Sequence, residues 1–188
     1  MKRIILGSNS PRRRELLAGL DIDFTVDTGN TFEERLEPGV EAHQVPVQLS
    51  AGKSHGFHRP LAADEVLITS DTVVIVDQEV LGKPHSREEA VGMLRKLSGR
   101  AHEVVTAVTI RDCEREETFS VSTQVHFETL TQAEIDHYID KYRPYDKAGA
   151  YGIQEWIGYV GISAIEGSFY NVMGFPVHRV WHALQRFL

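Results

Sequence analysis

The chain has 188 residues, with 20 Lys or Arg against 27 Asp or Glu, so its formal net charge is −7. A net acidic surface argues against nucleic acid and anionic membranes as partners. One cysteine, Cys113, excludes an internal disulfide, and no apolar stretch approaches membrane-spanning length. The three-residue apolar run near Met1 does not fit a signal peptide. We therefore expect a cytoplasmic protein with no membrane association, built as one domain over residues 1–188.

The first seventeen residues organise the chain. They predict a short buried strand over residues 4–6, a small polar loop, and a helix that begins at Pro11 with Ser10 as its N-cap. Three arginines, residues 12–14, follow where the helix dipole disfavours cations. An anion bound at this turn would explain them. The alternative is a solvated basic turn, and the segment alone leaves both interpretations open.

The next stretch contains two charged features. A short strand over residues 23–27 leads into a loop over residues 28–41, which holds the paired carboxylates Glu33 and Glu34. A helix is predicted over residues 40–57, with Lys53 near its end. Lysine is common in a last helical turn, so Lys53 alone gives no functional signal.

Asp71 lies within the apolar, β-branched run of residues 65–77, which is typical of buried strands. A carboxylate in such a run is costly unless it is paired, hydrogen-bonded or metal-bound. The alternative is a strand-end Asp in a bulge or turn. Because no Gly or Pro flanks it, we favour a functional carboxylate.

The second half of the chain alternates helices and strands. The hairpin formed by the two strands over residues 104–127 argues against an all-parallel sheet, so we predict an α/β protein with a mixed sheet. Thr131 and Glu134 form a capping box at the start of another helix. The remaining predicted elements are a helix over 88–97, two strands over 104–111 and 119–127, a helix over 131–141, a glycine-weakened strand over 157–165, a small-residue loop over 167–176 and a final helix over 177–187.

Six motifs, in the same order and over nearly the whole chain, resemble the Maf family of nucleotide pyrophosphatases. They are SNSPRRRELL at residues 8–17, SDTVV at 70–74, GKP at 82–84, MLRKLSGRAHEVVTAV at 93–108, DKAGAYGIQ at 146–154 and NVMGFP at 171–176. The resemblance implies a two-lobed ITPase-like (Ham1-like) fold, in which helices flank a twisted mixed sheet around a central cleft. It also implies a homodimer.

The resemblance further implies hydrolysis of the α–β bond of nucleoside triphosphates, to a monophosphate and pyrophosphate, in the control of nucleotide pools. The DKAGAYGIQ motif, with Gln154 at its end, resembles that of the subgroup that prefers dTTP and UTP. The subgroup that acts on 7-methyl-GTP usually carries Glu at this position. Asp71 matches the family's proton acceptor. Arg12 and Thr72, with Gln154, match positions that tune substrate choice. The other polar positions matched are Ser8, Arg13, Glu34, Lys53 and Lys83.

The expected chemistry follows from the charge of the substrate. A triphosphate carries about four negative charges, which guanidinium forks and lysine ammonium groups can bind. We expect a divalent cation, Mg²⁺ or Mn²⁺, to be touched by Glu34 and Asp71, directly or through water. The competing hypothesis is a non-catalytic nucleotide-binding regulator of septation and cell division, which would need the cations but not Asp71 as a base.

Overall fold

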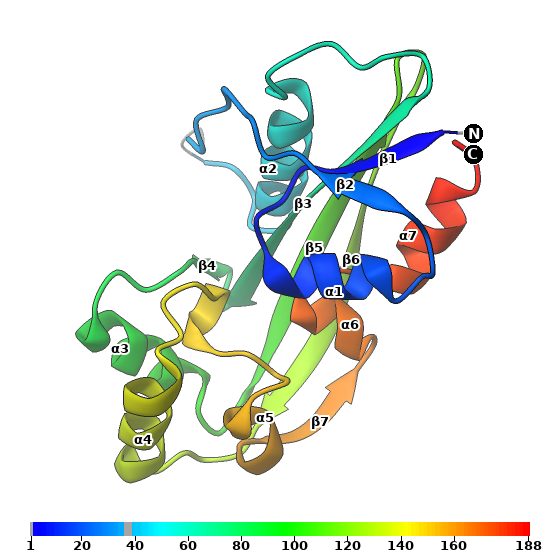
Figure 1. The fold of residues 1–188 in the computed structure, drawn as a ribbon. Helices are drawn as coiled ribbons and strands as arrows, with labels where there is room; N and C mark the ends of the chain where they lie inside the picture. The colour runs from blue at the N-terminus through cyan, green and yellow to red at the C-terminus, as the bar shows by residue number, and fades with distance from the viewer. Residues whose placement is uncertain (1, 36–38) are drawn as a thin grey trace. The chain divides into compact units, whose positions relative to one another are not determined.

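The computed structural model describes residues 2–35 and 39–188. Within these residues a seven-stranded sheet has the order β2-β1-β3-β5-β6-β7, and β4 pairs with β3 outside that path (Figure 1). The strands are β1 (Arg3–Leu6), β2 (Phe24–Val26), β3 (Glu65–Val76), β4 (Glu79–Leu81), β5 (Ala101–Arg111), β6 (Glu116–Phe127) and β7 (Ile162–Glu166). The helices are α1 (Pro11–Ala18), α2 (Gln44–His55), α3 (Arg87–Leu97), α4 (Gln132–Tyr142), the 3₁₀ turn η1 (Ala148–Ala150), α5 (Trp156–Val160), α6 (Phe169–Met173) and α7 (Val177–Leu184).

The sheet is mixed, which confirms the predicted α/β class. Strand β1 runs parallel to both β2 and β3, whereas β4 is antiparallel to β3 and β7 is antiparallel to β6. The local signals at two helix starts are confirmed as well. Ser10 caps α1 with Pro11 in its first turn, and Thr131 and Glu134 form a reciprocal capping box on α4.

The chain divides into two compact units. Unit 1 comprises the chain up to Thr72 together with Thr106–Val121 and Gly174–Leu188. Its core includes Ile5, Phe57 and Leu67, which pack together with Leu61 against them. Unit 2 comprises Val73–Val105 and Ser122–Met173. In this unit α3 contacts α4, α5 contacts β7, and the fully buried side chains include Leu94, Tyr138, Ile139 and Ile157.

Three predicted elements differ most from the structure. The helix predicted over residues 40–57 is shorter, because α2 spans Gln44–His55. The strand predicted over residues 157–165 is wrong in its first half, where Trp156–Val160 form α5 and bury Ile157. The predicted loop over residues 167–176 contains the short helix α6. Residues 36–38 of the predicted loop over 28–41 lie outside the described residues.

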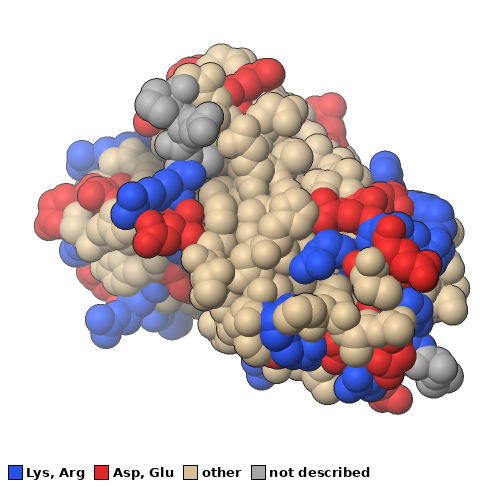
Figure 2. All heavy atoms as spheres, turned by 90° about the horizontal axis from the view of Figure 1, so that it is seen from above, with Lys and Arg blue, Asp and Glu red and all other residues tan. Residues whose placement is uncertain are grey.

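The surface fits the mixed composition. On the face drawn in Figure 2, the described basic and acidic side chains are interspersed. None of the described helices is both long and apolar enough to cross a membrane.

Candidate active site

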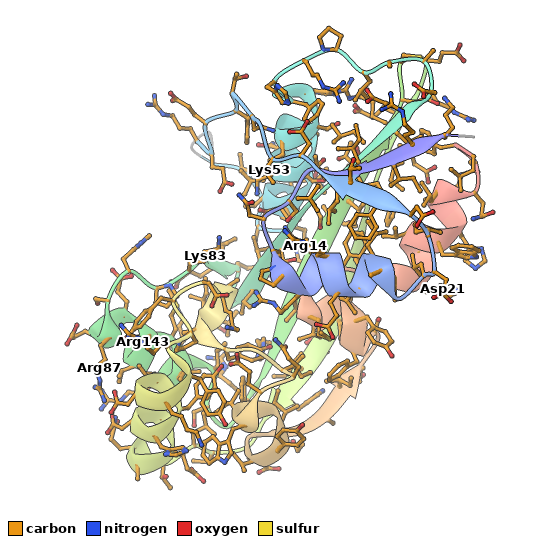
Figure 3. All side chains as sticks on the ribbon, viewed as in Figure 1. Arg14, Asp21, Lys53, Lys83, Arg87 and Arg143 are labelled. Atoms are coloured by element: carbon orange, nitrogen blue, oxygen red, sulfur yellow. The ribbon has the colours of Figure 1, made fainter. Side chains whose placement is uncertain are left out.

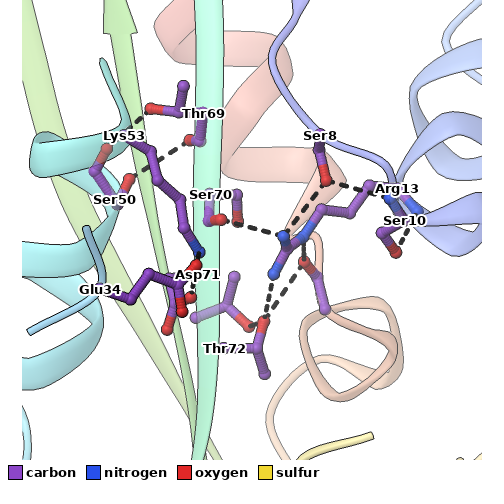
Figure 4. A network of polar contacts seen from close by, with 12 residues as sticks. Ser8, Ser10, Arg13, Glu34, Ser50, Lys53, Thr69, Ser70, Asp71 and Thr72 are labelled. Atoms are coloured by element: carbon purple, nitrogen blue, oxygen red, sulfur yellow. Dashed lines mark hydrogen bonds and ion pairs between the residues drawn. The ribbon is translucent and has the colours of Figure 1, made fainter. Parts of the chain in front are cut away.

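Two carboxylates meet one ammonium group beside the middle of β3. Asp71 lies inside this strand, not at its end, and is only 9% exposed. Lys53, in the last turn of α2, donates from Nζ to Asp71 Oδ1 at 2.7 Å. Glu34 Oε1 lies 2.9 Å from the same nitrogen (Figure 4). The buried carboxylate noted in the sequence is therefore paired, and the three predicted residues Glu34, Lys53 and Asp71 form one cluster.

The position of Lys53 depends on hydrogen bonds between α2 and β3 nearly one turn earlier. Thr69 Oγ1 donates to the Ser50 carbonyl at 2.8 Å, and Ser50 Oγ lies 3.3 Å from the Thr69 carbonyl and 2.9 Å from Thr109 Oγ1. Ser50, Thr69 and Thr109 are all buried. Satisfied buried polar groups rigidify a packing contact. This contact fixes the position of α2 along β3, and so places Lys53 beside Asp71.

The loop that carries Glu34 is held against Gly52 of α2 and against Gly56, the C-cap of that helix. A Cβ at Gly52 would come within 2.3 Å of the Phe32 ring, and one at Gly56 within 2.6 Å of Asn30 Oδ1. Asn30 Nδ2 also donates to the Lys53 carbonyl at 2.6 Å. Sequence reasoning missed these supports, although residues four apart on a helix share one face, and a pair of glycines there is a signal of close packing.

Arg13 is bound by acceptors of the protein itself. Its Nε donates to the Gly174 carbonyl at 2.9 Å, and its Nη2 donates to Thr72 Oγ1 at 3.1 Å. Its Nη1 donates to the Ser70 carbonyl at 2.9 Å and to Ser8 Oγ at 3.4 Å. The guanidinium therefore links the loop before α1, strand β3 and the start of the last segment of unit 1. Figure 4 shows Arg13 and Lys53 reaching the same stretch of β3 from different helices.

These contacts give Arg13 a structural role that the sequence did not reveal. Burial lowers the pKa of its guanidinium, while the negative charges of Asp71 and Glu34 favour the protonated form and the neighbouring Arg12 disfavours it. A guanidinium has five N–H donors, and four contacts to protein acceptors leave little for a ligand. Its predicted role as a phosphate ligand stays a prediction.

The other arginines of this turn differ in exposure. Arg12 is half-buried, whereas Arg14 is exposed and lies on the surface of α1 (Figure 3). The side chain of Thr72 is shared, because its hydroxyl accepts from Arg13 and also lies 2.9 Å from Thr106 Oγ1. Of the residues predicted to tune substrate choice, Arg12 and Thr72 thus belong to unit 1.

Lys83 and Gln154 belong to unit 2. Lys83 is exposed and lies two residues after the end of β4 (Figure 3). Gln154 is half-buried and lines an open hollow of about 410 Å³ between α5 and β7, together with Tyr159, Phe169 and small side chains such as Ser163. Its Oε1 atom is buried and has no hydrogen-bond partner among the described residues. An unpaired buried acceptor is costly, so a hydrogen-bond donor at this oxygen would be stabilising.

The carboxylate pair also fits a hard divalent cation. Among the described residues, no group of three or more His, Cys, Asp or Glu side chains is arranged to hold a metal. Mg²⁺, however, is usually bound by one or two carboxylates together with substrate phosphates and water. Glu34 and Asp71 supply such a pair of oxygen ligands at one point.

The fold resembles that of a known class of proteins. A HAM1 protein from Coxiella burnetii superposes with a TM-score of 0.51 at 12% identity, covering 99% of this chain and all of that one. The Ham1 protein of Staphylococcus aureus gives a TM-score of 0.52 at 15% identity over 98% of this chain and all of that one. The chain is thus an α/β protein of Ham1-like fold.

Sequence relatives narrow this class to one family. Residues 3–187 match the Maf-like protein family, and the chain belongs to that family. It is 48% identical to the dTTP/UTP pyrophosphatase of Parabacteroides distasonis, over 98% of this chain and 96% of that protein. It is 51% identical to the dTTP/UTP pyrophosphatase of Porphyromonas gingivalis, over 98% and 94%, respectively.

Proposed function

We propose that this protein hydrolyses dTTP and UTP to the nucleoside monophosphate and pyrophosphate. The observation that carries the proposal is the cluster of Asp71, Lys53 and Glu34, which combines a buried carboxylate with a cation at 2.7 Å. The names of relatives about 50% identical over the whole chain support the substrates. A non-catalytic nucleotide sensor would need a cation such as Lys53 to bind phosphate, but it would not need Asp71 as a base.

In this proposal Asp71 acts as general base. Water attacks phosphorus, Asp71 accepts its proton, and the bond to the bridging oxygen breaks so that pyrophosphate leaves with the electron pair. Because Lys53 donates to Oδ1, we assign the water to Oδ2. Lys53 then has two functions, since it orients the carboxylate and adds positive charge where phosphate oxygens bind.

We also propose a divalent cation, Mg²⁺ or Mn²⁺, held by Glu34 and Asp71. When bound, it would neutralise phosphate charge and polarise the phosphoryl group. The carboxylate pair supports this assignment because Lys53 already brings both side chains to one point. Arg12 and Lys83 are the further cations that we assign to the triphosphate, as predicted from the sequence.

We assign recognition of the base to Gln154. A glutamine amide carries both a donor and an acceptor, so it can pair with the adjacent carbonyl and N–H of uracil or thymine. The hollow that Gln154 lines together with Tyr159 and Phe169 supports this role. Aromatic side chains at the edge of a hollow offer apolar surface to a planar base.

The homodimer and the cytoplasmic location remain our proposals. Strand β7 ends the strand order of the sheet, and Tyr170 of α6, which follows β7 in the chain, is 49% exposed. Exposed apolar groups next to a sheet edge are typical of an interface. Light scattering on the purified protein should give about twice the 21.2 kDa chain mass, and a monomer at micromolar concentration would contradict the dimer.

The function is tested by pyrophosphate release from dTTP, UTP, CTP, GTP and 7-methyl-GTP, each with Mg²⁺, Mn²⁺ or EDTA. We expect metal-dependent cleavage of dTTP and UTP well above the others. Preference for 7-methyl-GTP would keep the reaction and refute the assignment of Gln154. Binding of nucleotides without turnover of any would favour the non-catalytic regulator.

A further inference from the structure

A buried lysine in unit 2 is unexplained by the proposed chemistry. Lys147 is only 8% exposed, and its Nζ lies 2.8 Å from Asp146 Oδ1 and 3.2 Å from Glu155 Oε1. Lysine is rarely buried unless it is paired, and buried ion pairs are often no more stabilising than apolar side chains of the same size. Its position in the segment that ends in Gln154 and Glu155 therefore suggests a specific task.

The partner carboxylate is fixed from two sides. Tyr138 of α4, which is fully buried, donates its hydroxyl proton to Glu155 Oε2. The same hydroxyl accepts from the Gly152 amide at 3.0 Å. Burial, followed by the charge and hydrogen bond of Glu155, raises the pKa of Tyr138, so the hydroxyl keeps its proton and remains a donor. Glu155 thus receives Tyr138 on one oxygen and Lys147 on the other.

These contacts also border Gln154, the residue before Glu155. A Cβ at Gly152 would lie 2.9 Å from Lys147 Cε and 3.2 Å from Gln154 Nε2. The stem of Lys147 and the amide of Gln154 therefore pack against the same glycine, whose backbone is held by Tyr138. The backbone before and after Gln154 is fixed at Gly152 and at Glu155.

We propose that Tyr138, Lys147 and Glu155 are positioning residues that hold the Gln154 amide in one orientation and thereby select uracil and thymine over cytosine. This inference rests on the proposed function, in which Gln154 reads the base. Uracil offers an N–H donor beside a carbonyl acceptor, and cytosine offers the reverse pair at the same two positions. A glutamine amide turned by 180° would match cytosine, so selectivity requires that the amide cannot turn.

The test compares kcat/KM for UTP and CTP. Tyr138→Phe removes one hydroxyl at nearly constant volume, and Lys147→Met keeps an unbranched apolar stem without the ammonium. For each we expect the UTP-to-CTP ratio of kcat/KM to fall at least tenfold from its wild-type value, chiefly through a higher KM for UTP. Gln154→Ala removes the amide altogether, so its UTP-to-CTP ratio of kcat/KM is the lowest value that we expect.

The control variant is Val76→Ala, a buried change in the same unit that none of these contacts involves. A loss of folded enzyme lowers both kcat/KM values equally, so the control should leave the ratio unchanged. If Tyr138→Phe and Lys147→Met behave like the control, the positioning role is refuted, whereas base reading by Gln154 itself is not. If wild-type enzyme does not prefer UTP, the base-reading part of the proposed function fails, and this inference fails with it.

Discussion

Replacement of Arg13 by lysine tests whether this residue is a structural link or a phosphate ligand. The guanidinium contacts four oxygens, at 2.9, 2.9, 3.1 and 3.4 Å, contributed by residues from three separate segments of unit 1. A lysine ammonium is a single point and can reach about two of them. The substitution keeps the positive charge but removes the planar set of N–H donors that binds the four oxygens.

The expected cost follows from the lost contacts. Hydrogen bonds to charged groups contribute about 1.5 kcal/mol each at the low end of their range, so two lost bonds cost about 3 kcal/mol. For a chain of this length that lowers the melting temperature by about 6–12 °C. Because Arg13 also binds the carbonyl of Ser70, next to Asp71, kcat should fall as well.

Thermal unfolding without nucleotide is the assay, and Arg14→Lys is the matched control. Arg14 is the exposed neighbour on the same helix, so this change should alter stability by less than about 0.5 kcal/mol. A normal melting temperature for Arg13→Lys, combined with a large loss of nucleotide affinity, would refute the structural link. Arg13 would then act mainly on the substrate.

Three further predictions concern the same framework. Lys53→Met leaves two carboxylates facing each other without their cation, and we expect kcat to fall at least about 100-fold; near-normal turnover would exclude this lysine from the site. Gly52→Ala should cost about 1–3 kcal/mol by displacing Phe32, whereas Gly92→Ala, a helical glycine with open space around it, should be neutral or stabilising; equal effects in urea unfolding would contradict the packing argument. Burial lowers the pKa of His102 to about 3. Below pH 6.5, His102 is therefore protonated in the unfolded chain while it stays neutral in the folded chain. Stability is then lost as the pH falls from about 6.5 toward 3, by about 2 kcal/mol between pH 7 and pH 5. His102→Gln should remove that part of the decline, and an unchanged pH dependence would refute it.

Local chemistry explains which elements could be predicted. The start of α1 depends on Ser10 and Pro11, and the start of α4 on Thr131 and Glu134, which act within one turn. The burial of Asp71 was also visible, because a carboxylate inside an apolar strand needs a partner. Its partner Lys53 lies 18 residues away in the sequence. This pairing depends on the packing of α2 against β3, so it could not be predicted from local sequence.

The remaining features depend on tertiary contacts. Residues Trp156–Val160 carry glycine and β-branched residues, yet they form α5 because the turn buries Ile157. The basic turn of α1 gave no sign that Arg13 points inward while Arg14 faces solvent, since the two differ only in their angular position on the helix. The frame around Gln154 requires α4 and the segment over residues 146–155 to meet, which no local pattern encodes.

The most direct test of the proposed function is pyrophosphate release from dTTP and UTP by wild-type protein and by Asp71→Asn, with nucleotide binding measured in parallel. We predict metal-dependent release by the wild type and a fall of about 10²–10⁴ in kcat for the variant, with binding largely retained. Substantial turnover by Asp71→Asn would refute its role as base and make Glu34 the preferred candidate. If the wild type released no pyrophosphate from any nucleotide, the claim that this protein is a nucleotide pyrophosphatase would be contradicted.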